Sequence, residues 1–326
     1  AYYANGQDGG GLTYPRNTQG MVKDALDLVD SMVDFGQFDT DNDGLIDSIT
    51  VLHSGYGAET GGGGGNWIWS HQWSLWQVPG GQGWVSKDRN GAFDFVRVMA
   101  YHTSPALWGA SGNNIVHLGV ICHETGHFFG LVDLYDTDGS SEGAGSWCLM
   151  ANSWGFDSTQ YYPPHPSAWS RSRLGWITPV TLISPGQYSI PRSATDPVAY
   201  RINYGFPPNE YLLLENRQPF GFEADIPMGG LAVWHIDDNK GSLLANNVNN
   251  DEGYPGQPGW PGNNRHYRVA LLQADGLYNL ERGQNRGDGG DLFRSGVADR
   301  IDDSTVPNLR TYQGGIVQNT NNSITS

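Results

Sequence analysis

The stretch that most constrains this chain reads HETGHFFGLVD and begins at His123. His123 and His127 are four residues apart, so on a helix both imidazoles project from one face, with Glu124 one position around. Gly130 follows the second histidine and would let the helix end in a left-handed turn. The chain could then fold back and carry Asp133 toward the two histidines. Two imidazoles and a carboxylate that face one point predict a bound metal ion.

Zinc is the ion that this set of donors favours. It binds imidazole nitrogen and carboxylate oxygen in near-tetrahedral geometry, and a catalytic site leaves one position open to water. Glu124 would then act as general base and acid, taking a proton from zinc-bound water and passing it to the leaving amine. The alternative is a buried helix without metal. We disfavour it because burying two histidines and a glutamate among apolar residues is costly without a metal.

A second zinc geometry would take its third ligand from a glutamate on a separate downstream helix. The candidates are Glu142, in the loop sequence DGSSEGAGS, and Glu210, in a part of the chain that is rich in predicted strands. Neither lies on a predicted helix. The predicted zinc ligands are therefore His123, His127 and Asp133.

A second motif, DTDNDGLID, has the spacing of a calcium-binding loop. Alternate carboxylates can converge on one ion, Gly44 permits a sharp turn, and the seventh position offers its backbone carbonyl. The predicted calcium ligands are Asp39, Asp41, Asp43, Leu45 and Asp47. Thr50 stands where a sensor loop carries a glutamate, so we expect a structural site.

A later acidic cluster has looser spacing, and either a further ion or a plain loop would explain it. Its members are Asp275, Asp288 and Asp291.

The hydrophobic pattern predicts an α+β fold. Apolar residues recur at helical spacing in three segments, 18–35, 113–130 and 166–176. Strand-like patterns occur at 48–55, which we expect to be buried, and at 66–75 and 93–101. Asn113 or Asn114 would cap the second helix. After about residue 178, short apolar runs alternate with Pro, Gly and Asn clusters, so we expect a first domain over 1–178 and a β-rich region over 179–326 that packs on it or continues it.

The charge of the chain excludes some partners. The formal net charge is -16, from 34 acidic and 18 basic residues, so the basic surface that nucleic acids and anionic membranes require is lacking. No run of apolar residues is long enough to span a membrane. The first residues, AYYANGQDGG, lack the pattern of a signal peptide, so either a targeting segment was removed or the chain is not exported. We expect a monomer.

The zinc motif resembles the H-E-x-x-H-x-x-G-x-x-H/D pattern of the metzincin metallopeptidases. That clan has a methionine-bearing turn beneath its zinc, and SWCLMANSWG fits it, with Met150 as the turn methionine. Asn152 occupies the position where some metzincins carry a tyrosine that acts on the transition state. Tyr161 or Tyr162 could serve instead, although surface packing is the expected role of both.

The resemblance narrows to the immune inhibitor A family of secreted bacterial metallopeptidases. The blocks that resemble it, in the family's order, include VDFGQFDTDNDGLIDSITVLHSGYGAE, WIWSHQWSL, LMANSWG, SAWSRSRLGWI and LLLENRQPFGFEADIPMGGLAVWHID. The family's aspartate in the third ligand position matches Asp133. Family members carry more sequence before the equivalent of AYYANG, including a propeptide and strands of the catalytic sheet, so the resemblance leaves open whether the N-terminal sheet is complete in this chain.

This resemblance implies a mixed sheet with a backing helix, an active-site helix and the methionine turn, in a secreted protein. Millimolar extracellular calcium would suit the acidic loop. Secretion would also allow Cys122 and Cys148 to form a disulfide that ties the zinc helix to the methionine turn, with two free thiols as the alternative.

The sequence therefore predicts a secreted zinc endopeptidase that hydrolyses peptide bonds of protein substrates, with structural calcium. One alternative is a zinc-containing binding or adhesion protein, whose contact residues would be Trp67, Trp69, Trp73 and Trp76. Glu124 argues against it, because a protein without turnover needs no general base. A third hypothesis is a metal-dependent amidase that acts on small molecules or cell-wall peptides.

Overall fold

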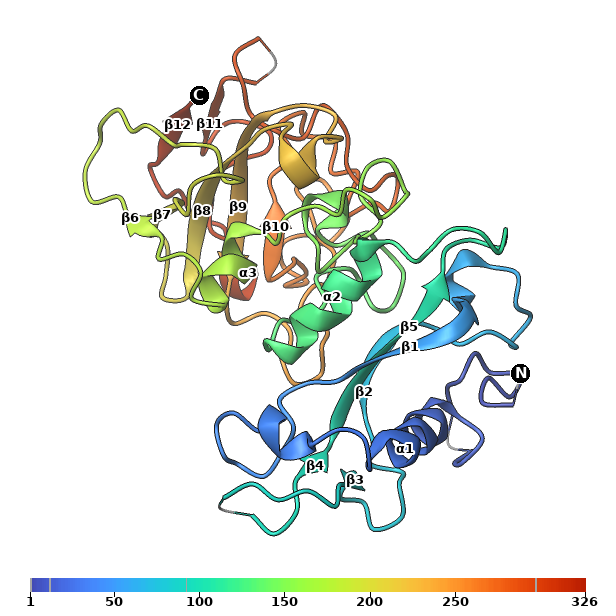
Figure 1. Cartoon of the computed structure of the whole chain (residues 1–326). Helices are drawn as coiled ribbons and strands as arrows, with labels where there is room; N and C mark the ends of the chain where they lie inside the picture. Colours follow the sequence, from blue (N-terminus) through green and yellow to red (C-terminus); the bar gives the residue numbers. More distant parts are fainter. Residues whose placement is uncertain (1, 12, 92, 297) are drawn as a thin grey trace. The chain divides into compact units, whose positions relative to one another are not determined.

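The computed structural model of the chain describes residues 2–11, 13–91, 93–296 and 298–326 (Figure 1). It divides into two compact units, Ala1–Phe128 and Phe129–Ser326. Helices and several separate sheets are both present, as the predicted α+β class requires.

The first unit contains a small mixed sheet. Its strands, in spatial order, are β1 (Thr50–Tyr56), β5 (Ala100–Leu107) and β2 (His71–Ser74). β1 is parallel to β5 and β2 is antiparallel to it. A two-stranded ladder joins β3 (Trp84–Val85) to β4 (Arg97–Val98). The prediction that β1 is buried is wrong, because its burial alternates from residue to residue and Leu52 is 54% exposed.

The first helix, α1 (Thr18–Val29), begins at Asn17, whose side chain accepts a hydrogen bond from the Gly20 amide at 3.0 Å. It buries Val22 and Leu26 in a cluster that includes Tyr101 of β5. The helix is shorter than the predicted 18–35.

A short 3-10 helix, η1 (Phe35–Phe38), follows α1 and leads into the acidic loop. The Asp34 side chain caps it by accepting a hydrogen bond from the Gly36 amide at 3.1 Å. This cap begins a separate element, so the predicted helix over 18–35 is divided into α1 and the start of η1.

The helix that carries the metal motif, α2, spans Leu118–Phe128. The prediction that Asn113 or Asn114 caps it is wrong. The backbone of residues 114–116 pairs instead with residues 106–108, at the end of β5 and just after it. The Trp108 amide donates to the Asn114 carbonyl at 2.9 Å, and the Val116 amide donates to the Ala106 carbonyl at 3.0 Å. The predicted end is confirmed, because Gly130 has φ +83.

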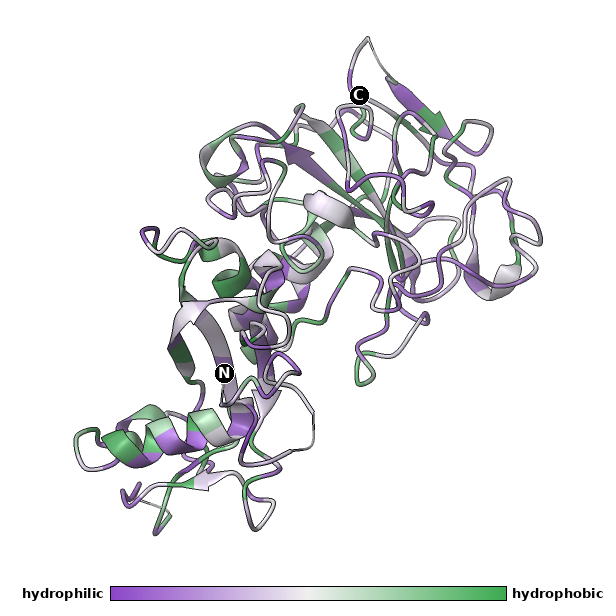
Figure 2. Ribbon diagram, turned by 90° about the vertical axis from the view of Figure 1, so that its right-hand side faces the viewer, coloured by the Kyte–Doolittle hydropathy of each residue, from purple (hydrophilic) through white to green (hydrophobic). Residues whose placement is uncertain are grey.

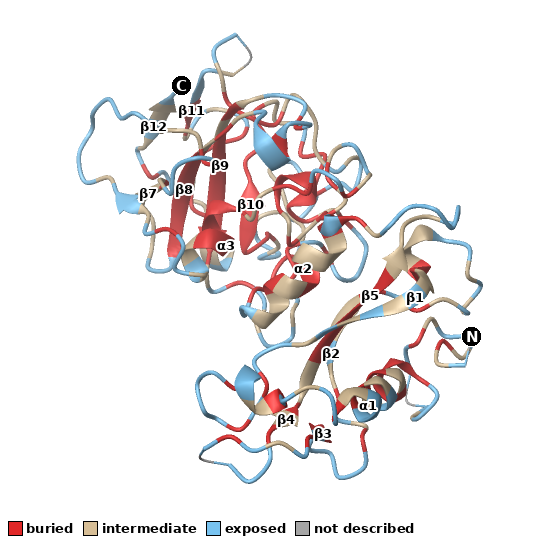
Figure 3. Cartoon of the chain, viewed as in Figure 1, coloured by how far each residue is buried: buried red, intermediate tan, exposed pale blue. Residues whose placement is uncertain are grey.

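The second unit is built on a five-stranded sheet, as the pattern after residue 178 predicts. Its strands, in spatial order, are β10 (Val269–Leu271), β9 (Gly230–Asp237), β8 (Glu210–Arg217), β7 (Tyr200–Ile202) and β6 (Val180–Thr181). All neighbours are antiparallel except β6 and β7. β8 and β9 are almost wholly buried (Figure 3).

Smaller elements complete this unit. The helix α3 (Ala168–Arg173) is capped by Ser167, whose side chain accepts a hydrogen bond from the Ser170 amide at 3.2 Å, and it is shorter than the predicted 166–176. A separate ladder pairs β11 (Arg300–Asp302) with β12 (Ser323–Thr325). The core packs Trp234 and Ile236 of β9 with Trp147 and Met150.

The predicted disulfide is wrong for this structure, because Cys122 and Cys148 are both free. Cys148 is buried, and its sulfur accepts a hydrogen bond from the Ser167 amide at 3.3 Å. Burial raises the pKa of both thiols, which disfavours the reactive thiolate form of each.

Among the described residues, no helix has both the length and the apolar content to cross a membrane. Apolar and polar colours are interspersed along the ribbon (Figure 2).

Candidate metal centre

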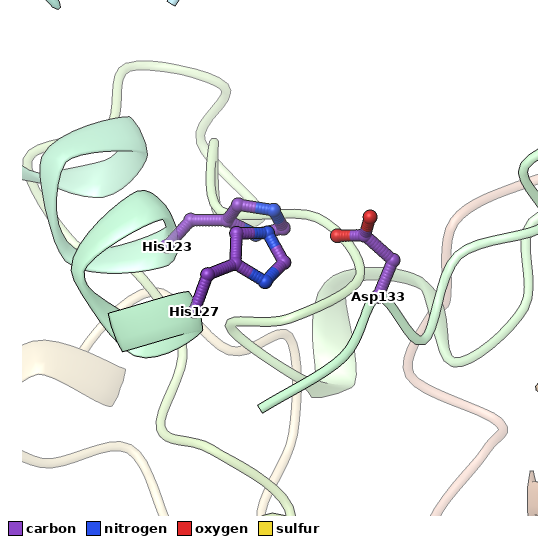
Figure 4. Close-up of side chains that lie close together, drawn as sticks. All are labelled: His123, His127 and Asp133. Carbon is purple, nitrogen blue, oxygen red and sulfur yellow. The ribbon is translucent and has the colours of Figure 1, made fainter. Parts of the chain in front are cut away.

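Within the continuous segment from His123 to Asp133, the structure brings the three predicted zinc ligands together. Their ligand atoms all lie within 4.8 Å of one another. The His123 and His127 rings project from the same face of α2, with centroids 5.0 Å apart and planes at 86°. Both rings point toward the Asp133 carboxylate (Figure 4). His123 and Asp133 are buried and His127 is half-buried, so an ion held here would be shielded from bulk water.

Asp133 is held by a residue far away in the sequence. Its backbone amide donates a hydrogen bond to Oδ1 of Asn246 at 2.7 Å. Nδ2 of Asn246 donates in return to Oδ2 of Asp133. Such hydrogen bonds fix the direction of a metal-binding carboxylate and contribute to metal affinity. The sequence reasoning missed Asn246, because one asparagine in a loop rich in asparagine carries no signal.

Met150 contacts the chain segment that carries Asp133. Its side chain is fully buried, and its carbonyl accepts a hydrogen bond from the amide of Leu134, the residue after Asp133, at 2.7 Å. Tyr161 and Tyr162 are 57% and 43% exposed. The backbone of Met150 therefore helps to place the segment that carries Asp133.

Glu124 is buried and tied to the mixed sheet of the first unit. Its Oε2 accepts a hydrogen bond from the backbone amide of Gln72 on β2 at 2.6 Å. β2 is an edge strand of this sheet. This contact is not predictable from the sequence, because a backbone donor leaves no trace in residue type. The hydrogen bond fixes the position of the carboxylate beside the two helical histidines.

A further histidine, His102, lies buried on β5 and bonds to the Ser104 hydroxyl at 2.7 Å. Burial, together with the neighbouring His71, His123 and His127, lowers its pKa to about 4. His102 is therefore neutral at physiological pH. It adds no positive charge next to the two helical histidines.

The acidic loop before β1 brings together the three carboxylates of Asp39, Asp41 and Asp43, with ligand atoms within 4.8 Å of one another. Asp39 is buried and accepts hydrogen bonds from the amides of Asp43 and Gly44, both at 3.0 Å. Leu45 forms an isolated bridge with Arg97. Asp47 instead accepts a hydrogen bond from the Thr40 hydroxyl at 2.6 Å.

The donor set of the first centre fits zinc. Two imidazoles and a carboxylate are common protein ligands of catalytic zinc, and three protein ligands leave one position for water or substrate. A glutamate beside the first of two histidines on one helical turn is the arrangement of a zinc-dependent peptidase. Fold and site together therefore define the class as metallopeptidase-like.

Comparison with known proteins identifies the family. Residues 1–177 match the model of the immune inhibitor A peptidase M6 catalytic domain. The chain belongs to this family, as the sequence motifs predict.

Two relatives illustrate the similarity. The chain is 37% identical over 172 residues to Immune inhibitor A of Bacillus thuringiensis subsp. alesti, covering 45% of this chain and 23% of that protein. It is 29% identical over 197 residues to Pre-pro-metalloprotease PrtV of Vibrio cholerae serotype O1, covering 53% of this chain and 20% of that protein. The alignments thus span less than a quarter of each relative's length.

Proposed function

We propose that this chain is a secreted zinc endopeptidase that hydrolyses peptide bonds of protein substrates. The observation that carries the proposal is a buried Glu124, anchored by the Gln72 amide, next to two helical histidines that converge with Asp133. Membership of a metallopeptidase family supports it.

His123, His127 and Asp133 would hold the zinc ion. When bound, zinc polarises a substrate carbonyl and makes water more acidic. Glu124 accepts a proton from the attacking water and then delivers that proton to the leaving amine nitrogen. The Gln72 amide donates to one carboxylate oxygen of Glu124 and so fixes the direction of this carboxylate. Asn246 keeps the Asp133 carboxylate turned toward the histidines.

The proposed organisation is a metzincin-like catalytic domain over residues 1–178, followed by a β-rich region over 179–326. The family match over residues 1–177 supports this boundary, which differs from the division of the structure into compact units after Phe128. Within it, α1 would be the backing helix, α2 the active-site helix and Met150 the turn methionine.

Calcium in the acidic loop is part of the proposal. Asp39, Asp41 and Asp43 would supply carboxylate oxygens, and Leu45 and Asp47 would complete the set. The converging carboxylates support this assignment, because their mutual repulsion is relieved by a divalent cation. Its role would be to hold the segment between η1 and β1 in place.

We also propose that the chain is secreted and monomeric. One relative is named a pre-pro-metalloprotease, which denotes a protein made with segments that are later removed. The net charge of -16 disfavours nucleic acid as a partner and leaves protein or peptide substrates.

The test of this function is casein cleavage by the full chain and by Glu124→Gln. Glutamine retains an oxygen that can accept from the Gln72 amide but cannot take a proton, so we expect a loss of about 10²–10⁴-fold in kcat with zinc content unchanged. The matched control is Glu142→Gln, which changes a glutamate that is paired with Arg286 on the surface. Full activity in Glu124→Gln would exclude the proposed role of Glu124.

One observation favours a binding function in addition to catalysis. Trp69, Trp73 and Trp76 are each about half exposed and line a cavity of about 470 Å³ in the first unit, together with Gln77 and Tyr101. Such a surface could hold an apolar or glycan group. If casein is not cleaved but zinc is bound, this binding hypothesis becomes the preferred one.

A further inference from the structure

The third acidic cluster of the chain lies in the second unit, in the loops that follow β10. Its members are Asp275, Asp288 and Asp291, whose ligand oxygens all lie within 4.8 Å of one another. Asp275 and Asp288 are half-buried and Asp291 is fully buried. The backbone ties the two loops together, since the Asp275 amide donates to the Gly290 carbonyl at 3.0 Å and Ala274 to Asp291 at 2.9 Å.

One oxygen of the buried carboxylate has no partner in the described structure. Oδ2 of Asp291 accepts hydrogen bonds from Nε1 of Trp147 and from the Asp288 amide, both at 2.7 Å. Oδ1 of Asp291 is buried and accepts no hydrogen bond. A buried carboxylate oxygen without a donor or a cation is costly, so this atom points to a missing ligand.

The other two carboxylates are also held in fixed directions. Oδ1 of Asp288 accepts from the Gly290 amide and Oδ2 from the Asn285 side chain, both at 2.7 Å. Oδ1 of Asp275 accepts from the Leu277 amide at 2.9 Å. These bonds use local donors and bring no positive charge to the cluster.

Among the described residues, no ion pair joins a basic group to the three aspartates. Arg286 pairs with Glu142, and the nearby Arg294 donates from Nη2 to the Gly289 carbonyl at 3.4 Å. Three neighbouring carboxylates without a basic partner repel one another, more strongly where they are buried.

The space between the carboxylates is kept open by a glycine. A Cβ atom added at Gly290 would lie 2.6 Å from Oδ2 of Asp275 and 3.1 Å from Oδ1 of Asp288. Any side chain at this position would therefore push the two carboxylates out of place.

We propose that Asp275, Asp288 and Asp291 form a calcium site that links the two loops after β10 and is separate from both the zinc centre and the loop at Asp39. The ligands are all oxygen atoms, which suits a hard divalent cation. Water and backbone carbonyls would fill the remaining positions of a coordination shell of 6–8 oxygens. Its expected dissociation constant is about 10⁻⁴–10⁻³ M, in the range of extracellular calcium modules.

The test is calcium binding, measured by calorimetry and equilibrium dialysis on the full chain loaded with zinc. The chain would carry Asp41→Asn and Asp43→Asn, so that the other acidic loop does not contribute. We expect one calcium ion per chain in this background. Asp288→Asn should then weaken binding by at least about tenfold, because it removes one ligand charge. Asp225→Asn, an exposed acid of the same unit, should leave binding unchanged.

Gly290→Ala provides an independent arm, because it keeps every carboxylate but displaces two of them. It should weaken calcium binding in a chain with a native circular dichroism spectrum. The proposal is overturned if the background chain binds no calcium, or if both Asp288→Asn and Gly290→Ala bind it as tightly as the background chain does. If Asp288→Asn does not fold, the result with Gly290→Ala decides.

Discussion

The contact between Asn246 and Asp133 allows a prediction that needs no assay of activity. Asn246→Gly removes both hydrogen bonds to Asp133, one to its backbone amide and one to its carboxylate. Glycine is the appropriate replacement because Asn246 has φ +52, where an alanine would add backbone strain. The change therefore isolates the side-chain contacts.

The expected loss of zinc affinity follows from the role of these two hydrogen bonds, which orient Asp133. Removing a residue that orients a metal ligand weakens metal binding by about 10–100-fold. This corresponds to about 1.4–2.8 kcal/mol of binding free energy. We expect the zinc dissociation constant of Asn246→Gly to rise by this factor, measured by competition with a fluorescent chelator.

The matched control is Asn247→Ala. Its side chain accepts a hydrogen bond from the Ser242 amide at 2.8 Å within the same loop. Zinc affinity should be unchanged in this variant. Our reasoning about Asn246 would be refuted by an Asn246→Gly chain that binds zinc as tightly as the wild type, or by an equal loss in both variants.

Three further predictions concern pH, a turn and the metal. Burial raises the pKa of Glu281 to about 7 from an ordinary 4.5, so its contribution to stability is present at low pH and is lost as pH rises through 7. Between about pH 4.5 and pH 7 the wild type should lose about 3 kcal/mol of unfolding free energy, measured by urea titration at each pH. In Glu281→Gln the unfolding free energy should depend less steeply on pH. An equally steep dependence would contradict the assignment of this effect to Glu281. Gly130→Ala should lower the unfolding free energy by about 1–2 kcal/mol in the same assay, because φ is +83 at this position. An added Cβ would meet no atom within 4 Å, so backbone strain alone would cause the loss. An unchanged unfolding free energy would exclude such strain. Treatment with 1,10-phenanthroline should abolish casein cleavage and added zinc should restore it; activity that survives in metal-free protein would exclude a metal-dependent reaction.

The sequence predicted best those features that depend on local spacing. His123, His127 and Glu124 lie within two turns of one helix, and Gly130 marks its end, so the pattern was enough to expect the convergence with Asp133. The β-rich second half was also evident, because its short apolar runs are separated by turn residues.

Features that depend on tertiary contacts were missed. The start of α2 was misplaced because the backbone near Asn114 pairs with the end of β5, which intrinsic helix capping does not reveal. Asn246 lies 113 residues from its partner Asp133. The pairing of Cys122 with Cys148 was inferred from the expected compartment, whereas the structure places Cys148 in a buried site with a hydrogen bond from Ser167.

The most direct test of the central claim is the zinc K-edge X-ray absorption spectrum of the full chain with one equivalent of zinc. We predict two imidazole nitrogens and carboxylate or water oxygens at about 2.0–2.2 Å, with no sulfur in the first shell. In Asp133→Asn chains the affinity for zinc should fall, and in His123→Ala chains one imidazole should disappear from the spectrum. A sulfur ligand at about 2.3 Å, or an unchanged spectrum in the His123 variant, would contradict the assignment of His123, His127 and Asp133 as the metal ligands.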